Sequence, residues 1–144
     1  MKIRDYTVND KKKVIELVSG ILVEIFNGDP KKFKVLREFD KTKDYVLFLV
    51  AEINGNIIGT MALKKIDKET VRLKRMYVRT EYRRKGIAQK LLDQVVTFAK
   101  ENGYKRMVLS TYSIMENARA FYNRNNFVET EGKDPEQIHV VKEL

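Results

Sequence analysis

The sequence contains no cysteine and a single histidine, His139. The chain can therefore form neither disulfides nor a thiolate metal site, and one histidine is too few for a zinc site built from several histidines. No apolar run approaches the roughly 20 residues that span a bilayer, and no signal-peptide core follows Met1. We expect a reduced, cytoplasmic protein that holds no metal and enters no membrane, in which His139 is structural.

The chain of 144 residues carries a net charge of +9. Its length fits one domain over residues 1–144. Between Arg72 and Lys90 there are eight basic residues against one acid, Glu81. A basic excess of this kind indicates nucleic acid, an anionic membrane surface or a phosphate-rich ligand as partner.

Hydrophobic periodicity and turn residues divide the chain into alternating strands and helices. A helix is expected after Thr7 and Asp10, ended by Gly28, and a shorter one from Asp29-Pro30. Asn54-Gly55 predicts a hairpin turn. The other expected elements are strands within 1–6, 45–53, 56–64, 71–79, 106–111, 127–130 and 137–141, and helices over 86–102 and 116–124. This order predicts an α/β fold with a mixed sheet and helices on both faces.

Three consecutive cations, Arg83-Arg84-Lys85, precede Gly86 and the strongly amphipathic helix. Cations at a helix N-terminus are unfavourable, because that end already carries about +0.5 charge. A phosphate or pyrophosphate bound to the free N–H groups of the first turn would explain them, and Gly86 would let it approach the backbone. A solvated basic loop explains the same residues equally well. The sequence contains neither a P-loop nor a Rossmann motif.

Two segments resemble motifs of the GNAT superfamily of N-acetyltransferases. Residues 83–88 resemble its [Arg/Gln]-x-x-Gly-x-[Gly/Ala] motif, and 117–122, followed by Asn126-Phe127, resemble its Asn-x-x-Ala-x-x-[Phe/Tyr]-Tyr…Gly-Phe signature, shortened by one position. The hairpin 52–59 and the strand 73–78 also match the family pattern. Asn126 replaces the usual glycine, and asparagine is well suited to a turn with positive φ.

The resemblance implies an acetyl-CoA-dependent N-acetyltransferase with an acyl-CoA N-acyltransferase-like fold. Its sheet would have six or seven strands, splayed after 71–79. The backbone of 83–88 would hold the coenzyme A pyrophosphate, and Met76 and Val78 would pair with the pantetheine arm. Asn117 would hydrogen-bond that arm. The cofactor-binding residues expected from the resemblance are Met76, Tyr77, Val78, Arg83, Arg84, Lys85, Gly86, Ile87, Ala88, Asn117, Ala120, Phe121 and Tyr122.

The implied reaction is direct attack of a primary amine on the thioester. The backbone N–H of Val78 would stabilise the oxyanion, and Tyr122 would protonate the leaving thiolate as general acid. The general base stays unassigned, because Arg72 and Lys74 stand where some members of the family place an acid. Glu52, Glu24 and a chain of waters are the candidates.

Two other functions remain as alternatives: a nucleic-acid-binding module that uses the basic strip 72–90, and a CoA-binding sensor without turnover. The first lacks a recognition-helix or RNP-type signature, so nucleic acid is disfavoured as a partner. The acceptor would be an amine of a small molecule or a protein, selected by residues 20–45 and 130–137. The basic surface favours neutral or acidic amines, although Glu24, Glu38, Asp40 and Asp44 could reverse this locally. The sequence does not decide the oligomeric state, for which a homodimer through an edge strand is one option.

Overall fold

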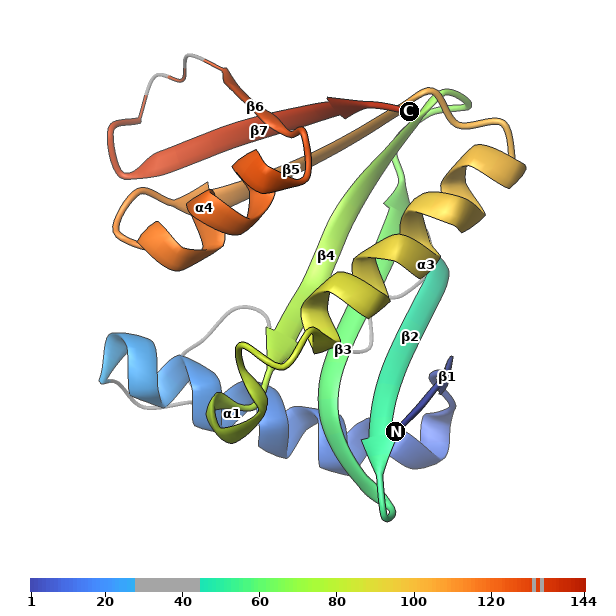
Figure 1. Cartoon of the computed structure of the whole chain (residues 1–144), viewed down its shortest axis with the longest axis vertical. Helices are drawn as coiled ribbons and strands as arrows, with labels where there is room; N and C mark the ends of the chain where they lie inside the picture. The colour runs from blue at the N-terminus through green and yellow to red at the C-terminus, as the bar shows by residue number, and fades with distance from the viewer. Residues whose placement is uncertain (28–44, 131, 133) are drawn as a thin grey trace.

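The computed structural model describes residues 1–27, 45–130, 132 and 134–144 (Figure 1). The elements expected from the sequence are present in these residues, with bounds within two residues of those expected, apart from the helix expected from Asp29-Pro30, which lies outside them. In chain order they are β1 (Lys2–Asp5), η1 (Val8–Asp10), α1 (Lys11–Phe26), β2 (Tyr45–Ile53), β3 (Asn56–Lys65), β4 (Thr70–Val78), η3 (Thr80–Tyr82), α3 (Ile87–Glu101), β5 (Arg106–Tyr112), α4 (Glu116–Arg124), β6 (Val128–Thr130) and β7 (Gln137–Glu143).

Seven strands of the described residues form one sheet in the order β1-β2-β3-β4-β5-β7-β6. All neighbours are antiparallel except β4 and β5. These two parallel strands pair only from Thr70 opposite Arg106 to Arg72 opposite Val108. Beyond Arg72 they diverge, as Figure 1 shows. The mixed, splayed sheet predicted from the sequence is confirmed, and we call the opening between β4 and β5 the seam.

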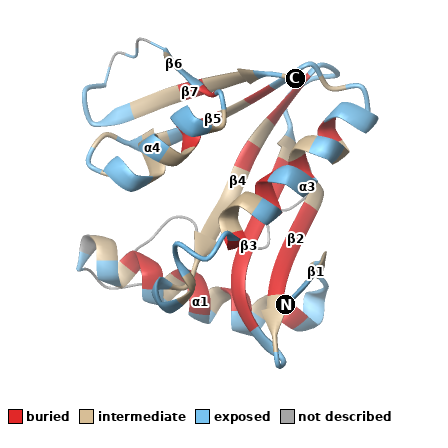
Figure 2. Cartoon of the chain, in the orientation of Figure 1, coloured by how far each residue is buried: buried red, intermediate tan, exposed pale blue. Residues whose placement is uncertain are grey.

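Helices cover both faces of the sheet. The apolar side of α1 packs on one face, against side chains of β2 and β3 such as Val50, Ile57 and Ala62. The opposite face carries α3, with α4 contributing Tyr122 to the same core. Buried residues line the facing sides of α3, β2 and β3 (Figure 2). None of the helices in the described residues is both long enough and apolar enough to cross a bilayer.

Residues with positive φ form the turns that position these elements. Asn54 and Gly55, at 50° and 80°, make the β2–β3 turn that the Asn-Gly pair predicts. Asn126 takes φ 67° after α4, so it replaces the expected glycine as predicted. The end of α1 was wrongly predicted, because Asn27 at φ 49° already ends the helix before Gly28 and bonds its N–H to Val23. Asparagine adopts this left-handed conformation readily, which explains the earlier end.

One glycine allows α3 to approach the sheet closely. A Cβ added at Gly59 on β3 would lie 3.4 Å from Cδ1 of Leu91 and 3.5 Å from Cγ2 of Ile87. It would also lie 3.2 Å from the carbonyl oxygen of Tyr77. The first turns of α3 thus lie at van der Waals distance from this position, and an added Cβ would be tight only against the backbone of β4 at Tyr77.

Candidate active site

The end of β4 directs backbone groups into the seam. Val78 lies opposite Gly59, and the N–H of Arg79 bonds to the carbonyl of Ile58 at 2.8 Å. In an antiparallel ladder this pattern marks Val78 and Gly59 as a pair without mutual hydrogen bonds. The N–H of Val78 therefore points away from β3, toward the side where β5 has diverged. This orientation suits an oxyanion donor at Val78, and the pairing of a strand-like ligand with Met76 and Val78 stays a prediction.

A bulge in β4 contains Arg75 and Met76. Ala62 of β3 faces Lys74 and Thr60 faces Tyr77, so β4 has one residue more than β3 between the two pairs. Arg75 takes φ 55° there, and the buried hydroxyl of Thr60 donates a hydrogen bond to its carbonyl oxygen at 2.6 Å. A β-branched side chain on the partner strand thus stabilises a conformation that is rare for arginine.

The basic loop lies where β4 leads into α3. The first bond of this helix runs from the N–H of Lys90 to the carbonyl of Gly86, so the N–H groups of Ile87, Ala88 and Gln89 precede it. Arg83, Arg84, Lys85 and Gly86 are all exposed. Gly86 has φ 80°, and a Cβ added to it would meet no atom within 4 Å. The loop is therefore a concentration of positive charge at an open helix N-terminus, which suits a phosphate or pyrophosphate.

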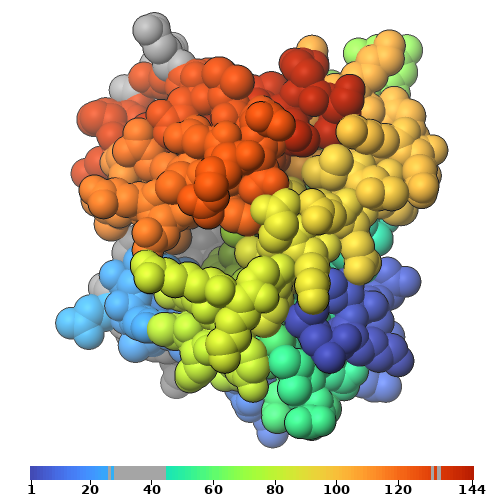
Figure 3. Space-filling view, in the orientation of Figure 1, coloured from blue at the N-terminus to red at the C-terminus, as the bar shows by residue number. Residues whose placement is uncertain are grey.

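Other contacts fix this loop to its neighbours. The Nε of Arg83 donates to the carbonyl oxygen of Val78 at 3.2 Å, and Lys85 lies over the ring of Tyr82. In Figure 3 the surface is hollowed between the yellow-green atoms of the loop and the orange atoms of α4. The hollow therefore has the basic loop on one side and the second sequence motif on the other.

Tyr122 reaches the seam from α4. It is 6% exposed, and its hydroxyl donates to Sδ of Met76 at 3.1 Å. Its ring packs edge-on against Phe121 and Phe127. Burial, and to a lesser degree the nearby Tyr77 hydroxyl, raise the pKa of Tyr122 well above its usual value. The phenol is therefore protonated at neutral pH and can donate a proton or a hydrogen bond into the seam.

An amide pair fixes α4 against α3. The side chains of Gln89 and Asn125 exchange two hydrogen bonds, at 2.8 and 3.1 Å. Asn117 and Ala120 are exposed on α4, whereas Phe121 is half-buried against the core. The two sequence motifs are thus brought together through a contact at the first turn of α3 that sequence reasoning missed. Gln89 and Asn125 gave no signal in the sequence, because two polar residues 36 positions apart share no local pattern.

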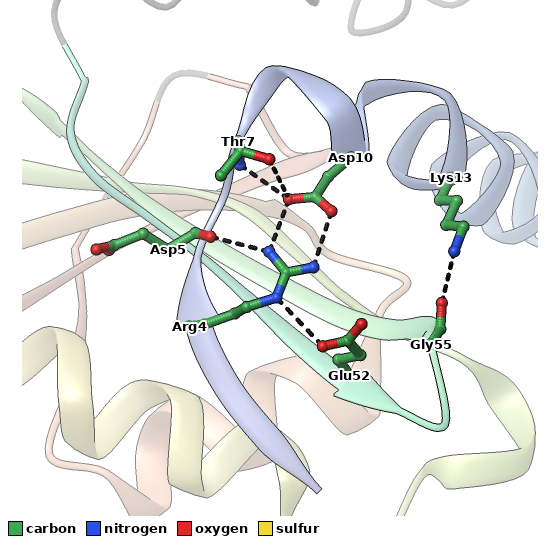
Figure 4. A network of polar contacts seen from close by, with 7 residues as sticks. All are labelled: Arg4, Asp5, Thr7, Asp10, Lys13, Glu52 and Gly55. Carbon is green, nitrogen blue, oxygen red and sulfur yellow. Dashed lines mark hydrogen bonds and ion pairs between the residues drawn. The ribbon is translucent and has the colours of Figure 1, made fainter.

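Glu52 lies in a polar network at the β1 edge of the sheet, away from the seam between β4 and β5 (Figure 4). Its carboxylate accepts from Nε of Arg4 at 3.2 Å, and the same guanidinium makes two 2.8 Å bonds to Asp10. Asp10 also accepts from the N–H of Thr7. The network joins β1, β2 and the start of α1. This placement supports a structural role for Glu52, and its role as base stays a prediction.

The other candidate base, Glu24, and the single histidine occupy different positions. Glu24, exposed on α1, accepts a 2.7 Å hydrogen bond from the hydroxyl of Thr80, two residues after Val78. His139 on β7 shares a 2.7 Å hydrogen bond with Ser110 on β5. Glu24 is therefore linked to the segment that carries the predicted oxyanion donor. Within the described residues, no group of three or more histidine, aspartate or glutamate side chains could hold a metal ion.

Comparison with known proteins agrees with this geometry. The model of the acetyltransferase (GNAT) family matches residues 15–127, which include the seam, the basic loop and α4. Human N-acetyltransferase 8 is 35% identical over 101 residues, which cover 63% of this chain and 44% of that protein. The chain thus spans less than half the length of this relative.

Solved structures share the whole architecture. A GNAT-family acetyltransferase from Staphylococcus aureus Mu50 superimposes with a TM-score of 0.86 at 29% identity, covering 99% of this chain and 98% of the other. The PaiA N-acetyltransferase of Thermoplasma acidophilum, solved in complex with coenzyme A, gives 0.82 at 23% identity over 99% and 98%. With the family model covering both motifs and the splayed sheet shared along its full length, the chain belongs to the acetyltransferase (GNAT) family.

Proposed function

We propose that this protein transfers an acetyl group from acetyl-CoA to a primary amine by direct attack. The observation that carries the proposal is the orientation of the Val78 N–H into the seam, on a strand whose end contacts the basic loop through the bond from Arg83 to the Val78 carbonyl. One ligand can then contact both, with its phosphates at the loop and its thioester at the seam. The coenzyme A complex of the related PaiA protein supports this choice of ligand.

The residues of the seam have complementary tasks in this reaction. The neutral amine attacks the thioester carbonyl, and the new oxyanion accepts a hydrogen bond from the N–H of Val78. The carbon–sulfur bond then breaks, and the hydroxyl of Tyr122 gives its proton to the departing thiolate. The proton lost by the amine passes to Glu24 or to water, and a proton from solvent restores the phenol. The Met76 sulfur holds the hydroxyl in position until the thiolate forms.

Titration calorimetry with acetyl-CoA and an assay of thiol release over a panel of amines test the proposal together. Gly86→Asp places a carboxylate at the proposed pyrophosphate site and should abolish acetyl-CoA binding. Gly103→Asp is the matched control, because Gly103 has φ 81° at the other end of α3 and suffers the same backbone strain. Wild-type protein that binds no acetyl-CoA, yet binds DNA with a steep salt dependence, would instead support the nucleic-acid alternative.

A further inference from the structure

Tyr77 lies on β4 between two residues of the candidate site. Met76 accepts the hydrogen bond from Tyr122, and Val78 carries the predicted oxyanion donor. Both of these β4 side chains pack against the core on the α3 face, whereas Tyr77 packs against the core under α1. Tyr77 is therefore on the opposite face of the sheet from Tyr122, beside the same stretch of backbone.

The hydroxyl of Tyr77 lies toward the seam. Burial raises the pKa of Tyr77, and the charge of Arg75 opposes this rise. Tyr45 and Tyr112, the latter at the end of β5, raise the pKa of Tyr77 further. Tyr77 in turn raises the pKa of Tyr122 on α4. Such effects weaken with distance, so the Tyr77 hydroxyl is near the phenols of two elements, β5 and α4, on the far side of the seam.

This hydroxyl is open to a ligand. Within the described residues it has no hydrogen-bond partner and is not fully buried. The hydroxyl of Tyr122, by contrast, is bonded to Met76. Because burial raises its pKa, the Tyr77 phenol is protonated at neutral pH and does not act as a base. Its oxygen keeps lone pairs that can accept a hydrogen bond.

The reacting carbon needs different groups for the sulfur that leaves and for the nitrogen that arrives. Tyr122 reaches the seam from the α3 face and serves the departing thiolate. Tyr77 presents its hydroxyl from the α1 face, next to Val78, whose N–H would hold the oxyanion. As the nitrogen attacks it becomes positive, so the N–H that it keeps becomes a stronger donor. A hydrogen bond to the Tyr77 oxygen would therefore stabilise the transition state more than the bound amine.

We propose that the hydroxyl of Tyr77 accepts a hydrogen bond from the N–H that the attacking amine keeps, and that this contact selects primary over secondary amines. The inference rests on the proposed acetyl transfer and names the residue that distinguishes its acceptors. A neutral primary amine has two N–H groups: one proton is lost to Glu24 or to water, and the other stays on the nitrogen for Tyr77. A secondary amine has a single N–H, which it must lose in the reaction, so no donor remains for the phenol oxygen.

The test compares a primary amine with its own N-methyl derivative in the thiol-release assay, in wild type and in Tyr77→Phe. The primary amine is the member of the panel with the highest kcat/KM. Tyr77→Phe removes only the hydroxyl, so the ring should keep its packing and acetyl-CoA affinity should change little. We expect kcat/KM for the primary amine to fall by about 10-fold, the scale of a hydrogen bond to a charged group, and kcat/KM for the N-methyl amine to change less than about 2-fold.

Tyr45→Phe is the matched control, because Tyr45 packs against the same core but lies on β2, with β3 and β4 between it and the seam. It should leave kcat/KM for both amines unchanged. The pH profile of kcat/KM separates a hydrogen-bonding role from that of a base. Tyr77→Phe should lower this profile at every pH without shifting it, whereas loss of a base would remove its acidic limb.

Calorimetric titration of the primary amine into the protein–CoA complex gives a readout independent of turnover, and weaker binding to Tyr77→Phe than to Tyr45→Phe supports the contact. An equal fall in kcat/KM for both amines, or no fall for either, would overturn the role of Tyr77 while leaving acetyl transfer intact. Absence of acetyl-CoA binding by the wild type would overturn the proposed function and this inference together.

Discussion

The hydroxyl of Tyr122 on α4 donates a hydrogen bond to the Met76 sulfur on β4, across the seam where the two halves of the sheet separate. A thioether is a weak acceptor, so this bond is easily exchanged for one to a thiolate. The contact also places the phenol beside a strand whose backbone faces the seam. Met76 therefore holds the hydroxyl at the site without competing strongly with the leaving group.

Tyr122→Phe should lower kcat by about 10²-fold, the usual scale for loss of a general acid. The ring still packs against Phe121 and Phe127, so acetyl-CoA affinity should change little. Single-turnover thiol release and calorimetry would measure the two effects. Tyr104→Phe is the control, since Tyr104 packs at the rim of the same core in the segment between α3 and β5. Unchanged kcat, with chemistry limiting the rate, would leave Tyr122 as a core residue.

Glu52→Gln should keep kcat within about 2-fold of wild type and lower Tm by about 2–4 °C. The free energy of unfolding should fall by about 1 kcal/mol, because the bond to Arg4 is a partly exposed ion pair. Glu24→Gln makes the complementary change near Val78 and should lower kcat more than Glu52→Gln does. Thiol release measures kcat of the two variants, and thermal unfolding measures their Tm. A large loss of kcat in Glu52→Gln at unchanged Tm would assign the proton transfer to Glu52.

Much of the fold could be predicted because its signals are local. Asn54-Gly55 specifies its turn through its own backbone preferences, and the apolar face of α3 follows from spacing alone. The bulge at Arg75 depends instead on how β3 and β4 align and on the hydroxyl of Thr60, 15 residues away. The Arg4–Glu52 pair likewise joins residues 48 positions apart. Such contacts are set by packing, so they carried no pattern that the sequence could reveal.

Asp10→Asn should destabilise the protein at neutral pH by about 2 kcal/mol, since it removes the charged partner of a half-buried arginine. The Arg4 hydrogen bonds, with help from the Thr7 N–H, lower the pKa of Asp10 to about 2 in the folded protein. In the unfolded chain the pKa is about 3.9. The stabilisation is thus present above about pH 4 and is lost as the pH falls through about 2.

Urea unfolding of wild type and Asp10→Asn between about pH 2 and 7 measures this effect. The difference in the free energy of unfolding between wild type and Asp10→Asn should be constant above about pH 5 and shrink below it. Asp5→Asn is the matched control, because the exposed Asp5 side chain points away from the network in Figure 4. A difference in the free energy of unfolding that does not change with pH would mean that Asp10 acts through packing and not through its charge.

The protein should be most stable with glycine at position 126, less stable with the native asparagine and least stable with alanine. The residue has φ 67°, where a Cβ costs roughly 1–2 kcal/mol and asparagine recovers part of that cost. Asn126→Gly should raise Tm by up to a few degrees, and Asn126→Ala should lower it by about 2–4 °C. Differential scanning calorimetry checks the order. An alanine variant as stable as the glycine variant would show that the turn relaxes out of the left-handed region.

The seam also has a mechanical consequence. Within the described residues, β4 and β5 pair only from Thr70 to Arg72, and the N–H groups of Lys105 and Arg106 add two bonds to the carbonyl of Glu69, so few backbone bonds join the ladder of β1–β4 to that of β5–β7. Local opening should begin at this joint, where amide protons exchange with solvent sooner than those of the neighbouring ladders. A strand-like ligand in the seam would bond to β4 along the line where the sheet lacks a partner. A bound substrate would then act as a missing strand and should slow amide exchange along β4, in addition to the core that the two halves already share.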